Sequence, residues 1–375
     1  MVIKKFCERE RGRGLPNVGR GALAALFLMT APVARAQTNT ADLSSPAIQA
    51  RTPARDFLDG VAMAGNRIVV TGEHGIIAYS DDGGGTWQQA KVPVDVLITA
   101  IAFANAKDGW AVGHMGVILH TIDGGMTWQK QIDGQEVDQL DLAAAQAAQA
   151  ANSPLPTAEL AMRRAELFQN NGPDRPFLAV LAQSPQQAIV VGAYRMAVRT
   201  DDGGKTWTDM SLNVLDRLSH NLYGIAAIDD EIYISAETGI VFKSTDGGTF
   251  FQQVTAPTES TLFGIMPTSD GSVFAYGLGG AAFLSHDHGA SWHNVNVGTS
   301  SNITAGLLLN SGALLLASGT GSLYVSNDNG QTFQPLPQML PMLLTGLAQM
   351  PDGDVVVTGS SGVRILPKSD FAKTK

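Results

Sequence analysis

The stretch Thr121-Ile-Asp-Gly-Gly-Met-Thr-Trp128 decides the fold, because its pattern recurs along the chain. The common form is Ser/Thr-x-Asp-x-Gly-x-Thr/Ser-Trp/Phe, and we call each copy an Asp box. The six copies span residues 80–87, 121–128, 200–207, 244–251, 285–292 and 326–333. Their aspartates are Asp82, Asp123, Asp202, Asp246, Asp287 and Asp328, at spacings of 41, 79, 44, 41 and 41 residues. A period near forty residues is typical of a repeat architecture, and the spacing of 79 indicates an insertion of nearly forty residues.

Each residue type in the box has a structural role. The Asp carboxylate can accept hydrogen bonds from the N–H groups of a turn, the Gly supplies a positive φ, and the aromatic residue begins the next strand facing the core. We therefore predict that the six aspartates are structural. Four of the five tryptophans (Trp87, Trp128, Trp207 and Trp292) occupy the box position, which favours core residues over a sugar-stacking platform. The acidic spacing and closing Glu of an EF-hand calcium loop are missing.

The residues around each box predict four short antiparallel strands. In the first repeat these are 56–63, 68–72, 76–79 and a strand opened by Trp87, all short and bounded by Gly, Asp or Asn. A Gly-x-x-Gly-like turn between the second and third strands, the B–C turn, occurs seven times against six boxes. The seventh unit (343–350, 355–358 and 363–366) lacks its box and outer strand.

A closed ring removes the exposed edges of such sheets. The sequence therefore predicts an all-β fold, a seven-bladed β-propeller of four-stranded blades over residues 56–366. We expect the N-terminal segment 37–55, through residues 44–54, to supply the missing outer strand of the last blade. Residues 367–375 are expected to be a C-terminal tail.

The insertion, residues 133–176, lies between blades 2 and 3. Its composition favours two helices, at 138–151 and 158–170, with Thr157 as the cap of the second. Leu160, Ala161, Leu167 and Phe168 are expected on one side of that helix. A partly disordered linker is the alternative.

The first 36 residues read as an export signal. A basic region precedes a short apolar core at 21–30, and Ala34-Arg-Ala36 forms a cleavage pattern. An uncleaved membrane anchor is the alternative. Without residues 1–36, 18 basic and 32 acidic residues remain, a net charge of −14, which is unsuited to nucleic acid. The only cysteine, Cys7, would be removed, so no Cys–metal site is expected. We expect a periplasmic, monomeric protein that does not span the membrane.

Two groups of side chains are candidates for a site. His286, His288 and His293 flank one box, but two of them occupy variable turn positions, so we predict no metal site there. The B–C turns and the connections between blades share one face of a propeller, and loops on one face of a rigid scaffold often carry function. The partner-binding candidates on that face are Glu73, His74, His114, Met115, Tyr194, Arg195, Glu237 and Thr238, together with Leu160, Leu167 and Phe168 of the insertion.

The run from Gly113 to Trp128, which joins a Gly-x-x-Gly turn to an Asp box, resembles the repeat of the photosystem II stability/assembly factor family. The resemblance covers about residues 55–366. It implies an exported or lumenal seven-bladed propeller, a non-enzymatic assembly factor that binds partly assembled membrane-protein complexes. Relatives occur in non-photosynthetic bacteria, some associated with RND-type exporters. This chain departs from the photosynthetic pattern by lacking a lipobox Cys, by its insertion and by Arg195 in place of a turn glycine.

Two other function classes share this fold. Sialidases also carry Asp boxes, but they need three arginines around a carboxylate, a Tyr–Glu pair and an Asp acid/base. The predicted face offers Tyr194, Arg195, Glu73 and Glu237 but one clear arginine. A propeller that binds glycan or lipid without turnover is the other class, and Tyr194 is the evident exposed aromatic residue. We predict no catalytic, cofactor-binding or metal-binding residues.

Overall fold

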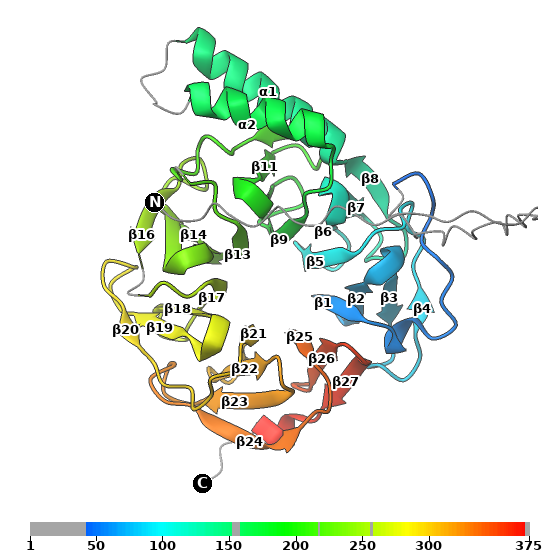
Figure 1. The fold of residues 1–375 in the computed structure, drawn as a ribbon. Helices are drawn as coiled ribbons and strands as arrows, with labels where there is room; N and C mark the ends of the chain where they lie inside the picture. The colour runs from blue at the N-terminus through cyan, green and yellow to red at the C-terminus, as the bar shows by residue number, and fades with distance from the viewer. Residues whose placement is uncertain (1–42, 152–157, 217, 256–257, 372–375) are drawn as a thin grey trace, which may run out of the picture. The chain divides into compact units, whose positions relative to one another are not determined.

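The computed structural model describes residues 43–151, 158–216, 218–255 and 258–371. Within these ranges the strands form seven antiparallel sheets arranged as a ring, which confirms the predicted seven-bladed β-propeller (Figure 1). The innermost strands contact one another in cyclic order, and the last of them contacts the first.

Six of these sheets have four strands, numbered from the inside of the ring outwards. Blade 1 comprises β1 (Leu58–Ala64), β2 (Arg67–Gly72), β3 (Ile77–Ser80) and β4 (Gln88–Gln89). Blade 2 comprises β5 (Ile98–Phe103), β6 (Gly109–Gly113), β7 (Ile118–Thr121) and β8 (Gln129–Ile132). Blade 3 comprises β9 (Phe177–Ala182), β10 (Ala188–Gly192), β11 (Ala197–Thr200) and β12 (Thr208–Asp209).

The remaining blades follow the same order. Blade 4 comprises β13 (Leu222–Ile228), β14 (Glu231–Ala236), β15 (Ile240–Ser244) and β16 (Gln252–Thr255). Blade 5 comprises β17 (Leu262–Pro267), β18 (Val273–Gly277), β19 (Ala282–Ser285) and β20 (His293–Asn294). Blade 6 comprises β21 (Ile303–Leu308), β22 (Leu314–Ser318), β23 (Ser322–Ser326) and β24 (Gln334–Met339). Blade 7 has three strands in the described part of the chain, β25 (Leu344–Gln349), β26 (Val355–Gly359) and β27 (Gly362–Leu366).

The core lies between neighbouring blades. Second strands such as β6 and β22 are buried along their whole length, because each is covered by a blade on both faces. The box aromatic of one blade packs on the blade before it, so Trp128 of blade 2 contacts Val69 and Ile77 of blade 1. Trp207 of blade 3 likewise packs with Trp110 of blade 2.

In blades 1 to 5 the B–C turns are short 3-10 helices: η2 (Glu73–Gly75), η3 (His114–Gly116), η4 (Ala193–Arg195), η5 (Glu237–Gly239) and η6 (Leu278–Gly280). The last residue of the turn has a positive φ and lies against the connection to the next blade. A Cβ at Gly75, for example, would lie 1.9 Å from the carbonyl oxygen of Val94, so only glycine fits there.

The predicted outer strand of blade 7 is wrong. Residues 44–54 form no strand paired with β27. They run instead along blade 1 (dark blue in Figure 1), where the Ala47 N–H donates to Val92 O at 3.0 Å and the Gln89 side chain donates to Ile48 O at 2.6 Å. The 3-10 helix η1 (Pro53–Arg55), which follows this segment, contacts β27. The ring is closed by packing of blade 1 on blade 7, through Leu58 and Val356 among others.

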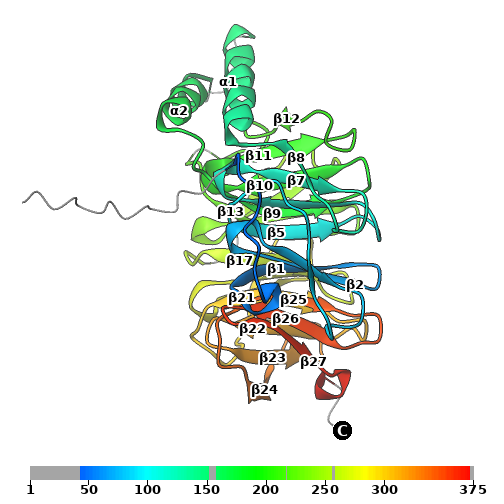
Figure 2. The ribbon, with the colours of Figure 1, turned by 90° about the vertical axis from the view of Figure 1, so that its right-hand side faces the viewer.

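The insertion is a helical hairpin, as predicted, made of α1 (Gly134–Ala150) and α2 (Ala158–Asn171). α1 begins four residues before the predicted start because Asp133 and Glu136 form a capping box. The predicted cap Thr157 lies outside the described residues. The hairpin stands outward from the ring at blades 2 and 3, away from its centre (Figures 1 and 2). Neither helix is long and apolar enough to cross a membrane.

The predicted apolar side of α2 is wrong in part. Ala161 and Phe168 are buried, whereas Leu160 and Leu167 are 50% and 54% exposed. The buried side instead contains Arg164 and Ala165. A polar residue thus occupies the face that the hydrophobic pattern assigned to leucines.

Candidate functional site

The Asp boxes form closed hydrogen-bonded turns. In the first box, Asp82 Oδ1 accepts from the Thr86 N–H at 2.8 Å, and Asp82 Oδ2 accepts from the Thr86 hydroxyl at 2.7 Å. The Ser80 hydroxyl donates to Asp82 and accepts from the Gly84 N–H, both at 2.8 Å. These bonds lower the pKa of Asp82 to about 2, because they favour the carboxylate.

The other boxes repeat this geometry with small changes. Hydrogen bonds to the box threonine or serine also lower the pKa values of Asp202 and Asp287 to about 2. In the fourth box Phe250 stands where the others carry Thr or Ser, and the carboxylate of Asp246 accepts from backbone N–H groups and Ser244. Each of these carboxylates is engaged within its own turn.

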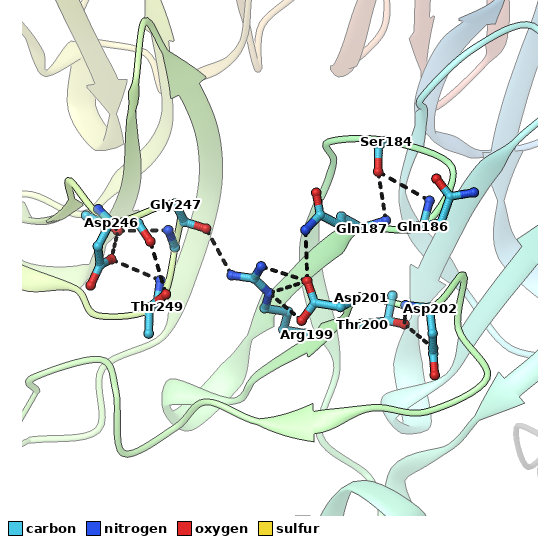
Figure 3. Close-up of polar contacts among 12 residues, drawn as sticks. Ser184, Gln186, Gln187, Arg199, Thr200, Asp201, Asp202, Asp246, Gly247 and Thr249 are labelled. Atoms are coloured by element: carbon cyan, nitrogen blue, oxygen red, sulfur yellow. Dashed lines mark hydrogen bonds and ion pairs between the residues drawn. The ribbon is translucent and has the colours of Figure 1, made fainter.

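Arginine side chains of one blade form hydrogen bonds with the Asp box of the next blade. Figure 3 shows Arg199 of β11, which donates to both oxygens of Asp201 and, at 3.0 Å, to the carbonyl of Gly247 in the next box. Arg67 of β2 pairs with Asp81 in the same way and donates to the carbonyl of Gly124 at 3.1 Å. The face that carries the boxes is therefore tied together from blade to blade.

The B–C turns hold the predicted partner-binding residues, and most of these have local partners. His74 Nδ1 lies 2.8 Å from Asp95 Oδ1, and Glu73 is exposed. His114 is exposed, with a pKa lowered by partial burial, and Met115 is half-buried beside it. Along blades 1 and 2 the structure thus leaves Glu73 and His114 on the surface.

The turns of blades 3 and 4 are joined by one asparagine. Asn221 donates through its side-chain amide to Glu237 at 3.0 Å and accepts from the Tyr194 N–H at 2.8 Å. Thr238 is exposed and lies 3.3 Å from His220 Nε2. Tyr194, at 53% exposed, is the large apolar surface residue of these turns.

Arg195 is not a surface residue, which corrects the prediction. Its side chain is buried and donates to the carbonyl oxygen of Asp216. Burial lowers the pKa of Arg195 to about 10. Arg195 therefore anchors the loop that follows blade 3 and is not available to a partner.

A buried ionic cluster fixes the hairpin to blade 3. Arg164 of α2 donates to Asp141 of α1 and, at 2.7 Å, to the hydroxyl of Ser211. Ser211 also donates to Asp209 of β12 at 2.9 Å. Burial, and secondarily the charge of Asp141, raise the pKa of Asp209 to about 7. Buried charges of this kind are stable only when paired, so the cluster determines where the hairpin sits.

A second pair supports the base of the hairpin. Arg175 donates to Asp138 of α1, and the side chains of both are 6% exposed. The guanidinium of Arg175 stacks 3.6 Å from the ring centroid of Phe168, whose ring lies 5.8 Å from that of Tyr194. Phe168 therefore packs on the propeller, while Leu160 and Leu167 remain exposed.

Five large apolar side chains are exposed on the elements that this cluster joins. We call the set the blade-3 rim surface; it comprises Leu160, Leu167, Tyr194, Leu215 and Leu218, each at least 43% exposed. α2 supplies the first two residues, the B–C turn the third, and the loop held by Arg195 the last two.

A sialidase needs three arginines that are free to bind the substrate's carboxylate. Three arginines do come together (Arg164, Arg175 and Arg195), but their described partners are the chain's own Asp141, Asp138 and the carbonyl of Asp216. Within the described residues, no group of three or more His, Cys, Asp or Glu side chains is placed to hold a metal ion. His286 and His288 have separate partners, Ser272 and Glu231.

Sequence reasoning missed the ionic cluster. Its acidic and basic members come from the insertion and from blade 3, at positions with no repeat pattern: Asp138, Asp141, Arg164, Arg175, Asp209 and Ser211. One signal was available, because Asp138 and Asp141 are three residues apart on one helix face, as are acidic residues that share a partner surface.

Comparisons with known proteins agree with the repeat pattern. Residues 85–148 and 173–259 match the family model described as Photosynthesis system II assembly factor YCF48, and residues 78–89 match the BNR/Asp-box repeat. Over 71 residues the chain is 38% identical to the Photosystem II assembly lipoprotein Ycf48 of Synechococcus sp. (strain CC9902). That stretch is 19% of this chain and 21% of the relative, so the match spans about a fifth of the curated relative's length. The resemblance drawn from residues 113–128 is confirmed.

Solved structures share the fold. One described as YCF48 bound to D1 peptide superposes with a TM-score of 0.61 at 19% identity, covering 86% of this chain and 98% of that one. YCF48 from Cyanidioschyzon merolae gives a TM-score of 0.61 at 16% identity, covering 84% and 96%. The WD40 β-propeller domain of Doa1 gives 0.59 at 12% identity, covering 89% and 100%.

Proposed function

From its relationship to the YCF48 photosystem II assembly factors, we propose that this chain is a non-enzymatic accessory factor that binds a membrane-protein complex and assists its assembly or stability. A YCF48 structure bound to D1 peptide supports a partner of the membrane-protein class. The exposed apolar side chains of the described residues offer surface for such a partner.

The blade-3 rim surface is the contact that we propose. The observation that carries it is the exposure of Leu160 and Leu167 on a hairpin whose other side is fixed by buried charges. A rigid support with exposed apolar side chains is how interfaces commonly present their anchors, because little entropy is lost on binding.

The location and state of the protein are part of the proposal. The signal-like residues 1–36 lie outside the described residues, and they support export to the periplasm. There the chain would act as a monomer on a membrane complex. Partner capture would distinguish a photosystem-type complex from an RND-type exporter.

The test is capture of the partner from native membranes by affinity-tagged chain, with cross-linking and mass spectrometry. The variant Leu160→Asp/Leu167→Asp is expected to fold normally and to lose most of the captured complex. The matched control is Ile122→Asp, a residue 66% exposed on the second Asp box. Equal capture by all three proteins would refute the assigned surface, and hydrolysis of a sialoside abolished by Tyr194→Phe would refute the non-enzymatic role.

A further inference from the structure

In the described part of the ring, the outer edge of β27 differs from the third strands of the other blades, because no fourth strand pairs with it. Each of the other six sheets covers its third strand with a fourth, whereas the described part of blade 7 ends at β27. An uncovered edge presents backbone N–H and C=O groups to which an extended segment can pair.

One carbonyl shows how the edge is arranged. In blades 1, 3 and 5, the third strand offers an outward carbonyl to the chain just past the fourth strand. Ala90 N–H donates to Ile77 O at 2.8 Å, Met210 N–H to Ala197 O at 2.8 Å, and Val295 N–H to Ala282 O at 2.9 Å. The equivalent oxygen in blade 7 is that of Val363, by register with the second strand. It accepts instead from Nη1 of its own neighbour, Arg364, at 2.8 Å.

Blade 7 also lacks the aromatic residue of a box. Trp87 of blade 1 packs with Ile365 of β27, and the residue of β23 at the same register is Val325. Phe371, from the 3-10 helix η7 (Lys368–Phe371), packs near Val325 in place of a box aromatic. It leaves a groove of about 420 Å³ between β24 and η7, lined by Val325, Leu336 and Phe371 with polar residues at its rim.

Charge favours one kind of occupant. Arg364 is exposed and donates hydrogen bonds to the carbonyls of Val363 and Ser361. In blade 3 the position that corresponds to Arg364 is held by Val198 of the third strand. Asp209 of the fourth strand pairs with Val198. An acidic residue at that place in an incoming strand would face the guanidinium across the pair.

We propose that the edge of β27 and the groove beside η7 form one acceptor site for an extended segment of a partner protein. The segment contains four consecutive residues in the order aromatic, polar, acidic and apolar. The segment adds a fourth strand to blade 7, its aromatic side chain enters the groove, and Arg364 exchanges the carbonyl of Val363 for the acid. This site lies across the ring from α1 and α2 (Figure 1) and does not depend on the proposed function.

The chain itself supplies the probe. A fluorescein-labelled peptide of residues 205–212, Lys-Thr-Trp-Thr-Asp-Met-Ser-Leu, has the required order. Titration with the full chain, followed by fluorescence anisotropy, is expected to show saturable binding. Changing Trp207→Ala in the peptide should weaken binding roughly tenfold, as loss of an interface anchor does.

A charge exchange tests the register. Asp209→Lys in the peptide should weaken binding roughly fivefold or more, and Arg364→Glu in the protein should restore it for that peptide alone. Because Arg364 is exposed, this protein is expected to keep the unfolding temperature of the parent, which calorimetry checks.

Three outcomes would overturn the proposal: absence of saturable binding, the same peptide preference in the Arg364→Glu protein, and binding that appears only when the chain is truncated after Phe371. The last would mean that residues 372–375 occupy the edge. Concentration-dependent dimers lost in the Arg364→Glu protein would show that a second copy is the occupant, and would also overturn it.

Discussion

Replacing Arg164 by alanine is expected to release the helical hairpin from blade 3 while leaving the ring folded. The Arg164 and Asp141 side chains are 9% and 5% exposed, and the guanidinium also holds Ser211. Without the arginine, Asp141 stays buried as an uncompensated charge beside Asp209. The hairpin can avoid that cost by moving into solvent.

The size of the effect follows from this burial. Removing one partner of a buried ion pair costs about 3–5 kcal/mol. The other contacts that hold the hairpin, among them the Arg175–Asp138 pair and the packing of Phe168 on Arg175, are the same in the parent and the variant. A cost of about 3 kcal/mol would raise the released population by roughly a hundredfold.

Hydrogen exchange read by mass spectrometry is the assay. Protection of residues 134–171 should fall about a hundredfold, while that of the second strands, such as β6 and β22, should not change. The control is Arg163→Ala, because the pair of Arg163 with Glu159 is 73% and 76% exposed and its loss should be nearly silent. Unchanged protection in Arg164→Ala, or an equal loss in the second strands, would refute this account.

Three further results are expected. Burial raises the pKa of Asp209 to about 7 from an ordinary value of 3.8, so the folded chain binds one more proton than the unfolded chain between these pH values. The unfolding temperature should therefore fall as the pH rises from about 4 to about 7. Asp209→Asn should flatten this part of the plot of unfolding temperature against pH. Phe371→Ala should cost about 3–5 kcal/mol in urea unfolding, because the ring is 8% exposed and fills the place of a box aromatic; a loss under 1 kcal/mol would contradict that packing. Deleting residues 43–51 should lower the free energy of unfolding by only about 2–3 kcal/mol, at roughly 1 kcal/mol for each of a few hydrogen bonds. Chemical cross-links between blades 1 and 7 should still form in the shortened chain. Loss of these cross-links would show that the segment is needed for closure of the ring.

The repeat made the ring predictable. Six boxes and seven B–C turns fixed the blade number, because each residue of the pattern has a local geometric reason that does not depend on the rest of the chain. The hydrogen bonds of Asp82 and the packing of Trp128 follow directly from those positions. The local repeat pattern therefore predicts the whole propeller except the way in which the ring is closed.

Closure was mispredicted because it depends on competition between two distant surfaces. The spacing from Ala50 to Leu58 equals that from Ala90 to Ile98, so residues 48–50 have the reach to serve as a fourth strand of blade 7. Ala54 does lie against Gly362, as Val94 lies against Gly75. Before residue 54, however, the segment packs on blade 1, where Ala47 is buried. The sequence does not show which is more favourable, this burial or pairing with β27.

The candidate site was predictable only where it follows the repeat. Tyr194 was placed on the surface correctly, whereas Arg195 was assigned to the surface although it is buried. Phe168, a partner candidate on a side of α2 that was expected to be buried, packs on Arg175 of the chain itself. The burial of Arg195 depends on the carbonyl of Asp216 in the loop after β12, and that of Phe168 on Arg175, which pairs with Asp138 of α1. A single sequence does not show such pairings between segments without a period.

Arg195 shows how departures from the repeat are linked to one another. A non-glycine residue in the left-handed region, here at φ 63°, costs about 1–2 kcal/mol, and the other six B–C turns carry glycine at this position. The loop after blade 3 is longer than that after blade 1: Leu222 lies twelve positions after Met210, whereas Ile98 lies eight positions after Ala90. That length makes room for the arginine side chain and supplies the carbonyl that it binds. The same loop carries Ser211, which holds Arg164 of the hairpin. The insertion, the long loop and the strained arginine therefore form one structural unit, and departures of this kind from a regular pattern are expected at functional sites.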